Sequence, residues 1–471
     1  VYFLSPAELT INDNPYAGMY SLIACLWAFL FVKYWKRKNQ EYLVEWDSFD
    51  VILDPQEDLR AEYVGKIRVN PVTEKTELFE PFQKKMGRYL MSVAVTFPFI
   101  LIVVYFQTIF LNLNAYVEEE SILYIQYFAH MAQPGEIFDP NGEGYGWLAV
   151  AIGQPVVTLI LSEIFRVVAI YSTDEENHRT QEEYDNVLIL KRFIFEFIDA
   201  FGYLFYIAFY NCDVINLRTS LIALYSADSF RRIFTRAVIP MAQLRIEDKI
   251  EQRELAKKKK SDSATAQDEA EQREFRMVKK ELQLTEYERF DDYLEMVIQF
   301  GYITLFAAAF PLAGLFSLIG NAIESRIDVF KITQLWRRAE SKKARDIGSW
   351  QYVLEFMAYC SIFSNILIFA YASDQMTEVF PWMFRKDDSV KAGMGRYVVG
   401  FVFGIEHLAI IIVLFLNWFI SNIPEWVQLF LERRRYENKA REASEHKEKM
   451  QKTMTAFSNL VGGKMFKTSK Q

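Results

Sequence analysis

The sequence is poor in the residues that build disulfide scaffolds and metal-binding modules. Its 471 residues include 3 Cys and 4 His. These counts exclude a disulfide framework and a Cys-rich zinc module, and they leave little room for a histidine-based metal site. No phosphate-binding glycine loop, dinucleotide fingerprint or Ser/His/Asp arrangement stands out. A formal net charge of -8 argues against a dedicated nucleic-acid binder. We therefore predict that the protein is not an enzyme.

Apolar residues and charges are segregated along the chain. The hydrophobic share is 51% and the aromatic share 16%, with 40 Phe, 26 Tyr and 9 Trp. Apolar blocks alternate with charged blocks such as IEDKIEQRELAKKKK, and a helix needs ~20 mostly apolar residues to cross a bilayer. We predict an all-α, polytopic transmembrane helical bundle of about nine spans. The spans are expected at 17–35, 88–111, 146–171, 188–211, 215–240, 291–310, 312–335, 347–371 and 396–421.

The distribution of charge predicts how the spans are oriented. KYWKRK follows the first span and FQKKMGR precedes the second, whereas VEEESILYIQYFAHMAQPGEIFDPNGEGYG carries no Lys or Arg. The first two stretches are predicted to be cytosolic and the third to lie outside the cytosol. The segment AKKKK either faces water or binds anionic lipid headgroups. We divide the chain into a first membrane half (1–240, five spans), a cytosolic charged helical insertion (241–290), a second membrane half (291–421, four spans) and a cytosolic charged tail (422–471).

Four acidic residues stand out in the sixth and seventh spans. Asp292 and Glu295 are three residues apart, and Glu324 and Asp328 are four apart, so each pair lies on one helix face. A short turn near Pro311 makes the two helices antiparallel, so the acidic faces can meet. Four carboxylates repel one another unless a cation lies among them, and this number of hard oxygen ligands suits Ca²⁺. The alternative is that the acids lie at the cytosolic ends of the helices and are solvated.

Charged side chains also occur within the third to fifth spans. Charge at membrane depth is costly unless it is paired or faces water. The set either forms salt bridges that lock the bundle or lines a hydrophilic path open to lipid headgroups, and the number of charges favours the path. The predicted groove or regulatory residues are Glu163, Arg166, Lys191, Asp228, Arg232 and Arg236.

Long motifs carry a resemblance to a known family. The stretch YLEMVIQFGYITLFAAAFPLAGLFSLIGNAIESRIDVFKITQLWRR, followed by DIGSW, resembles the anoctamin (transmembrane protein 16) family. The likeness continues in LWAFLFVKYWKRK, ENHRTQEEYDNVLILKRF, LFYIAF and GIEHL, and extends from about residue 17 to 440. ENHR, FDDYLE and NPVTEKTELFEPFQKK look most like the anoctamin-ten branch. Because the family has ten transmembrane helices per subunit, the nine spans would be its second to tenth. Its first helix and N-terminal domain are expected to be absent from this sequence.

The resemblance implies a function and a set of ligands. It implies a homodimer, with contact through the last span near Glu406 and His407, and a separate path in each subunit. Members are Ca²⁺-activated phospholipid scramblases or Ca²⁺-activated anion channels, and some are described as membrane tethers. The family's calcium ligands on its seventh and eighth helices match Asp292, Glu295, Glu324 and Asp328.

Departures from the family pattern lead to a modified expectation. Counting back from Pro240, the sixth-helix glutamate and asparagine of the family fall on Arg236 and Arg232. We hypothesise that these guanidiniums partly neutralise the four carboxylates. The expected function is a phospholipid scramblase with a modified Ca²⁺ site and weak Ca²⁺ dependence. The alternatives are a Ca²⁺-activated anion channel and a membrane-contact tether. The branch likeness and the lack of an N-x-Ser/Thr sequon favour the endoplasmic reticulum or another internal membrane, with the plasma membrane still open.

Overall fold

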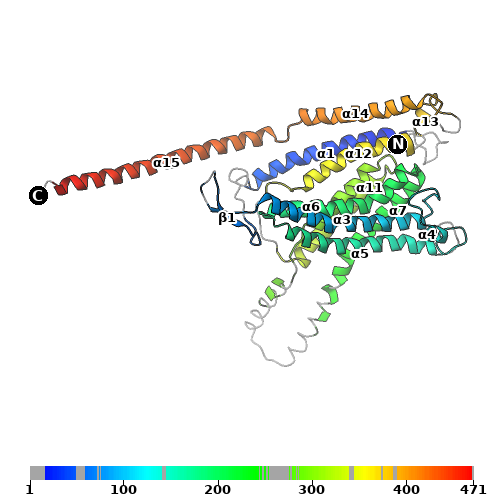
Figure 1. Cartoon of the computed structure of the whole chain (residues 1–471), viewed down its shortest axis with the longest axis horizontal. Helices are drawn as coiled ribbons and strands as arrows, with labels where there is room; N and C mark the ends of the chain where they lie inside the picture. The colour runs from blue at the N-terminus through cyan, green and yellow to red at the C-terminus, as the bar shows by residue number, and fades with distance from the viewer. Residues whose placement is uncertain are drawn as a thin grey trace. The chain divides into compact units, whose positions relative to one another are not determined.

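The computed structural model describes most of the chain, and the described part is largely helical (Figure 1). The described residues are 16–48, 59–71, 74, 76–139, 145–242, 286–338, 344–372, 375–385 and 390–468, with scattered positions between 244 and 284. Most of the predicted insertion at 241–290 therefore lies outside the described residues. The chain forms two compact units, which are described separately below. The first comprises Val1–Val32, Glu57–Lys342 and Gly348–Phe415, and the second comprises Lys33–Gln56, Lys343–Ile347 and Leu416–Gln471.

A helix occupies each of the nine predicted apolar segments. Three of these helices continue into a π-helical turn, at η1 (Phe234–Val238), η2 (Lys331–Leu335) and η3 (Ile368–Ala372). Five helices of the described part are long and apolar enough to cross a membrane, so the total of nine spans stays a prediction. The nine helices are α1 (Ala17–Glu45), α3 (Phe82–Leu113), α5 (Gly146–Glu175), α6 (Gln181–Phe209), α7 (Val214–Ile233), α10 (Phe290–Leu305), α11 (Ala313–Phe330), α12 (Trp350–Leu367) and α14 (Gly395–Phe419).

Shorter elements join these helices. Strands β1 (Lys66–Val69) and β2 (Thr76–Phe79) form an antiparallel hairpin in which Lys66 lies opposite Phe79. The helices α4 (Gln126–Met131) and α13 (Gln375–Val379) are each little more than one turn long. The hairpin precedes α3 and was not predicted from the sequence.

Capping residues in the sequence define where α6 and α7 begin. The hydroxyl of Thr180 accepts a hydrogen bond from the backbone N–H of Glu183 at the start of α6. The carboxylate of Asp213 accepts two backbone hydrogen bonds, from Ile215 and Asn216, at the start of α7. Such side chains satisfy backbone donors that a helix leaves unpaired in its first turn. These caps let α5, α6 and α7 follow one another through very short turns.

The three helices α3, α5 and α6 pack together in the first unit (Figure 1). The rings of Phe165 and Phe195 stack with centroids 4.0 Å apart, beside the buried side chains of Val103 and Ala169. This packing fixes the position of α5 against α6, and polar side chains of these two helices line the candidate site.

The second unit contains the end of α1 and the long helix α15 (Glu425–Thr468). Leu43, Val427 and Leu431 form its buried apolar cluster. Lys33 donates to the backbone carbonyl of Asn417 at 3.1 Å, and Arg37 donates to that of Ser421 at 2.8 Å. Cations are favourable near the carboxyl end of a helix, where carbonyl groups lack partners. These contacts stabilise the carboxyl end of α14.

Candidate groove and acidic cluster

A cavity of about 140 Å³ with several polar side chains in its wall lies within the first unit, between α5, α6, α7 and α10. Its α5 wall carries three polar residues at intervals of four, which places them on one helix face. Its α6 wall carries two acids three residues apart, and α7 and α10 contribute one charged residue each. The polar and charged lining residues are Gln154, Thr158, Ser162, Glu196, Asp199, Arg231 and Glu295.

Hydrogen bonds connect the two long walls of this cavity. The hydroxyl of Thr158 donates to Asp199 at 3.4 Å, and the hydroxyl of Ser162 donates to Glu196. Because α5 is one of the helices apolar enough to cross a membrane, these groups lie where unpaired polar atoms are costly. The cavity therefore carries a row of paired polar groups beside apolar lining residues.

Glu163 and Arg166 lie in an ion-pair cluster and are not among the residues that line this cavity. Arg166 lies 2.6 Å from Glu288 and 3.7 Å from Glu163. Next to it, the buried Arg192 pairs with Asp291 at 2.8 Å. Glu288 and Asp291 were missed from the sequence, because their role depends on the approach of α5 and α6 to the start of α10. The groove roles of Glu163 and Arg166 stay predictions.

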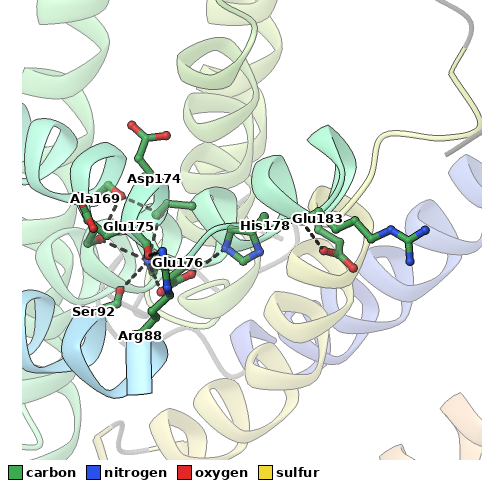
Figure 2. A network of polar contacts seen from close by, with 12 residues as sticks. Arg88, Ser92, Ala169, Asp174, Glu175, Glu176, His178 and Glu183 are labelled. Carbon is green, nitrogen blue, oxygen red and sulfur yellow. Dashed lines mark hydrogen bonds and ion pairs between the residues drawn. The ribbon is translucent and has the colours of Figure 1, made fainter. Parts of the chain in front are cut away.

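A buried polar network around Glu176 lies at the junction of α3, α5 and α6 (Figure 2), and Lys191 belongs to it. Its ammonium lies 2.7 Å from Glu176, 2.8 Å from Ser92 and 3.0 Å from Thr173. The Nε2 atom of His178 lies 2.8 Å from the same Glu176 carboxylate, and both residues are almost fully buried. Lys191 is thus held by several partners in a structural junction, away from the cavity lining.

The backbone of the α5–α6 turn is fixed within the same network. Asn177 adopts a left-handed φ of 57° and exchanges hydrogen bonds with the backbone of Val64. Its amide also donates to Glu80 at 2.7 Å, and Glu80 pairs with Arg88 at 3.2 Å. Arg88 in turn donates to the carbonyl of Glu175, as Figure 2 shows. The β-hairpin is thereby tied to the turn between α5 and α6.

Burial and hydrogen bonding shift the pKa of Glu176 in opposite directions. Burial alone would raise the pKa of the Glu176 carboxyl, since it disfavours the charged form. The hydrogen bonds from His178, Lys191 and Ser92 outweigh burial and hold the pKa below its ordinary value of 4.5. Glu176 therefore remains an anion that joins α5 to α6.

The four predicted calcium ligands lie on α10 and α11, and two basic side chains approach them. Lys331 was not considered from the sequence. Its ammonium lies 3.1 Å from Asp292 and 2.8 Å from Asp328. Arg232, from the end of α7, lies 3.2 Å from Glu324. Lys331 and Arg232 are each only 5% exposed.

Tyr287 is a further neighbour of Asp292. Its hydroxyl donates to the second carboxylate oxygen of Asp292 at 2.9 Å. Burial, followed by the charges of Asp292 and Asp328, raises the pKa of Tyr287 well above its usual range. The hydroxyl therefore keeps its proton and acts only as a hydrogen-bond donor to Asp292.

The arrangement around the acids does not fit a bound calcium ion. Carboxylates are the right donors for Ca²⁺. However, a lysine ammonium already lies between Asp292 and Asp328, where a shared cation would have to bind. In the described part of the chain, no three Asp, Glu, His or Cys side chains are placed so that they could hold a metal ion. The side chains of Asp228 and Arg236 lie outside the described residues, so their predicted roles stay predictions.

A second polar contact joins the same three helices deeper in the bundle. The Tyr225 hydroxyl lies 2.6 Å from the Ser317 hydroxyl, and Gln299 donates to Tyr225 at 3.4 Å. All three side chains are buried. Helices α7, α10 and α11 are therefore joined at two levels. One is the contact of Tyr225 with Ser317 and Gln299, and the other is formed by the ion pairs of Lys331 and Arg232.

Comparison with known proteins gives a consistent result. A family model described as "Anoctamin: Calcium-activated chloride channel" matches residues 1–434. Human Anoctamin-10 is 27% identical over 419 residues, which are 88% of this chain and 58% of that protein. Bovine Anoctamin-4 is 28% identical over 394 residues, covering 77% of this chain and 40% of the relative. Mouse Anoctamin-5 is 28% identical over 401 residues, covering 77% of this chain and 42% of the relative. The chain thus spans roughly half the length of these relatives.

Proposed function

This chain belongs to the anoctamin family of multi-pass membrane proteins, and we propose that it is a phospholipid scramblase. In this proposal, lipid headgroups cross between leaflets along a hydrophilic groove formed by α5, α6 and α7, while the acyl tails stay in the bilayer. Such transport needs no covalent chemistry and no nucleotide. It needs polar partners at membrane depth, because a polar headgroup in hydrocarbon loses its hydrogen bonds to water.

The polar cavity between α5 and α6 carries this proposal. Thr158 and Ser162 offer hydroxyls, and Glu196 and Asp199 offer carboxylates, on the facing walls formed by α5 and α6. A row of such groups can exchange hydrogen bonds with a passing headgroup and lower the barrier to its movement. The opposite face of α5 exposes Ile152, Val156 and Ile160, which suits contact with lipid tails.

An anion channel is the second candidate, because the matching family model is described as a calcium-activated chloride channel. The lining of the cavity argues against this candidate. Among the side chains that the structure describes, it contains the acids Glu196, Asp199 and Glu295 and one basic residue, Arg231. A pore lined by acids favours cations over anions. Scramblase activity therefore ranks above anion conductance.

The test is lipid exchange in liposomes that contain the purified chain. Thr158→Val combined with Ser162→Ala removes two hydroxyls from the cavity and should slow exchange about tenfold. The matched control is Thr96→Val on α3, because the Thr96 hydroxyl donates to its own helix backbone, at Ser92 and Val93. If the unmodified chain exchanges no lipid but conducts chloride, the channel is correct. Vesicle clustering without either activity would indicate a tether.

Assembly and location complete the proposal. The chain would form a homodimer through α14, with Glu406 and His407 facing protein or water, in the endoplasmic reticulum or another internal membrane. Exposed apolar side chains on α14, such as Val399, Phe403 and Leu408, support a contact there. Basic cytosolic segments would bind anionic lipid headgroups. Cross-linking of single cysteines placed along α14 tests the dimer, and a monomer in mild detergent would contradict it.

A further inference from the structure

Lys331 is a buried cation shared by two helices. It is the first residue of η2, directly after α11, and its side chain is 6% exposed. The ammonium lies 2.8 Å from Asp328 on its own helix and 3.1 Å from Asp292 on α10. A lysine ammonium has three donors and no acceptor, so it can serve two carboxylates together.

The two carboxylates would repel each other without this lysine. Removing a charge from water is costly, and the cost is recovered only when an opposite charge lies in good geometry. At Asp292 the Tyr287 hydroxyl supplies a further hydrogen bond, at 2.9 Å. The chain therefore provides the positive charge that this acidic pair requires.

A second basic side chain, Arg232, supplies positive charge to a third acid, Glu324. Arg232, which is 5% exposed, lies 3.2 Å from Glu324 and thereby joins α7 to α11. Both cations lie where an α-helix changes to a π-helix, since η1 begins at Phe234 and η2 begins at Lys331. Single π-helical turns are rare and occur frequently at functional sites.

We propose that Lys331, supported by Arg232, is an internal cation that holds α7, α10 and α11 together without a bound calcium ion. The structural effect of calcium on this chain is then small, because its place between Asp292 and Asp328 is taken by a covalently attached ammonium. Lys331 acts as a positioning residue. Under the proposed scramblase function, the groove beside α7 is held in its working form without calcium.

The test is thermal unfolding of the full chain in detergent, with chelator and with millimolar calcium. The unmodified chain should unfold at the same temperature in both, within about 1 °C. Lys331→Met removes the ammonium, should lower the unfolding temperature in chelator, and should let calcium raise it by about 3 °C, as expected for a newly available site. Lys331→Arg should restore insensitivity to calcium.

Arg326→Met is the matched control, because it removes one positive charge from the exposed face of the same helix. It should leave the response to calcium unchanged. A rise of several degrees in the unmodified chain would overturn the proposal, and this result does not require any variant to fold. An equal response of Lys331→Met and the unmodified chain would overturn it as well.

Lipid exchange gives a separate readout. Exchange by the unmodified chain should differ less than about twofold between chelator and calcium, whereas exchange by Lys331→Met should rise at least about fivefold with calcium. A chain that exchanges no lipid in either condition contradicts the scramblase function. The unfolding measurements still decide the role of Lys331, so the two failures are distinguishable.

Discussion

Two charge clusters in the first unit differ in their balance of charge and in the exposure of their acids. Around Glu176, one carboxylate is surrounded by Lys191, His178 and a serine hydroxyl, and its side chain is 3% exposed. Around Lys331, one ammonium serves Asp292 and Asp328, whose side chains are 24% and 39% exposed. The first cluster has several donors for one acid, and its carboxylate is almost fully buried. The second has more acid than base and its carboxylates are partly exposed, so it depends on Lys331 for its positive charge, and only a variant without Lys331 should respond to calcium.

The largest effect should come from Glu176→Gln. The substitution leaves Lys191 and His178 buried without their shared anion, and breaking a buried pair in this way costs about 3–5 kcal/mol of unfolding free energy. Glu175→Gln is the matched control, because the neighbouring Glu175 is exposed. Denaturant or thermal unfolding in detergent measures both. Equal stability of the two variants would show that the Glu176 network does not hold this junction.

A smaller loss should follow Lys331→Met in the absence of calcium. The carboxylates left behind are partly exposed, so water compensates for part of the lost pairing, and we expect a loss of about 1–2 kcal/mol. The same unfolding experiment ranks this variant against Glu176→Gln. If Lys331→Met is the more damaging of the two, the Lys331 cluster is the rigid one and the comparison is reversed.

Acid should weaken the Glu176 cluster over a defined range of pH. The pKa of Glu176 lies below 4.5 in the folded chain. Its contribution to stability is therefore complete above pH 4.5 and is lost as the pH falls through the lowered pKa. The difference in unfolding temperature between the unmodified chain and Glu176→Gln should shrink below that pH. A difference that stays constant into strong acid would contradict the assigned ionisation.

The smallest effect is expected in the second unit. Arg433 and Glu437 form an i,i+4 pair on α15 at 3.1 Å, with side chains 81% and 46% exposed. Arg433→Ala should change the unfolding free energy by less than about 0.5 kcal/mol. This variant calibrates the comparison, because it removes an ion pair that water surrounds. A loss as large as that of Lys331→Met would mean that exposure does not set the strength of these pairs.

The helices could be predicted from the sequence because apolar runs define them. Their ends were harder to predict, because charged residues can continue a helix beyond an apolar run. Helix α1 extends to Glu45, ten residues past the predicted end of the first span at 35, and the Lys38–Glu41 pair at 2.7 Å supports that extension. The β1–β2 hairpin was missed because strands of four residues with a Pro between them give little periodic signal.

The site was only partly predictable, because neighbouring positions on a helix face different partners. Asp291 pairs with Arg192 on α6, whereas Asp292 pairs with Lys331 beyond α11. Residues one apart point about 100° away from each other, so spacing alone could indicate acidic faces but not their partners. Lys331 was overlooked for the same reason. It lies three residues after Asp328, and whether such a lysine extends into water or turns into the bundle depends on where α10 packs.

The π turn at η1 has a consequence for alignment with relatives. A π turn holds one residue more than an α turn, so the side chains that follow Val238 are rotated about 100° from the faces that a continuous α-helix would give them. In a comparison with a relative whose helix is α throughout, one residue between 234 and 238 has no counterpart. When positions are counted back from Pro240, each family position before the π turn then corresponds to a residue one place nearer the N-terminus of this chain. The residue that stands opposite a given family ligand is therefore set by backbone geometry as well as by sequence order.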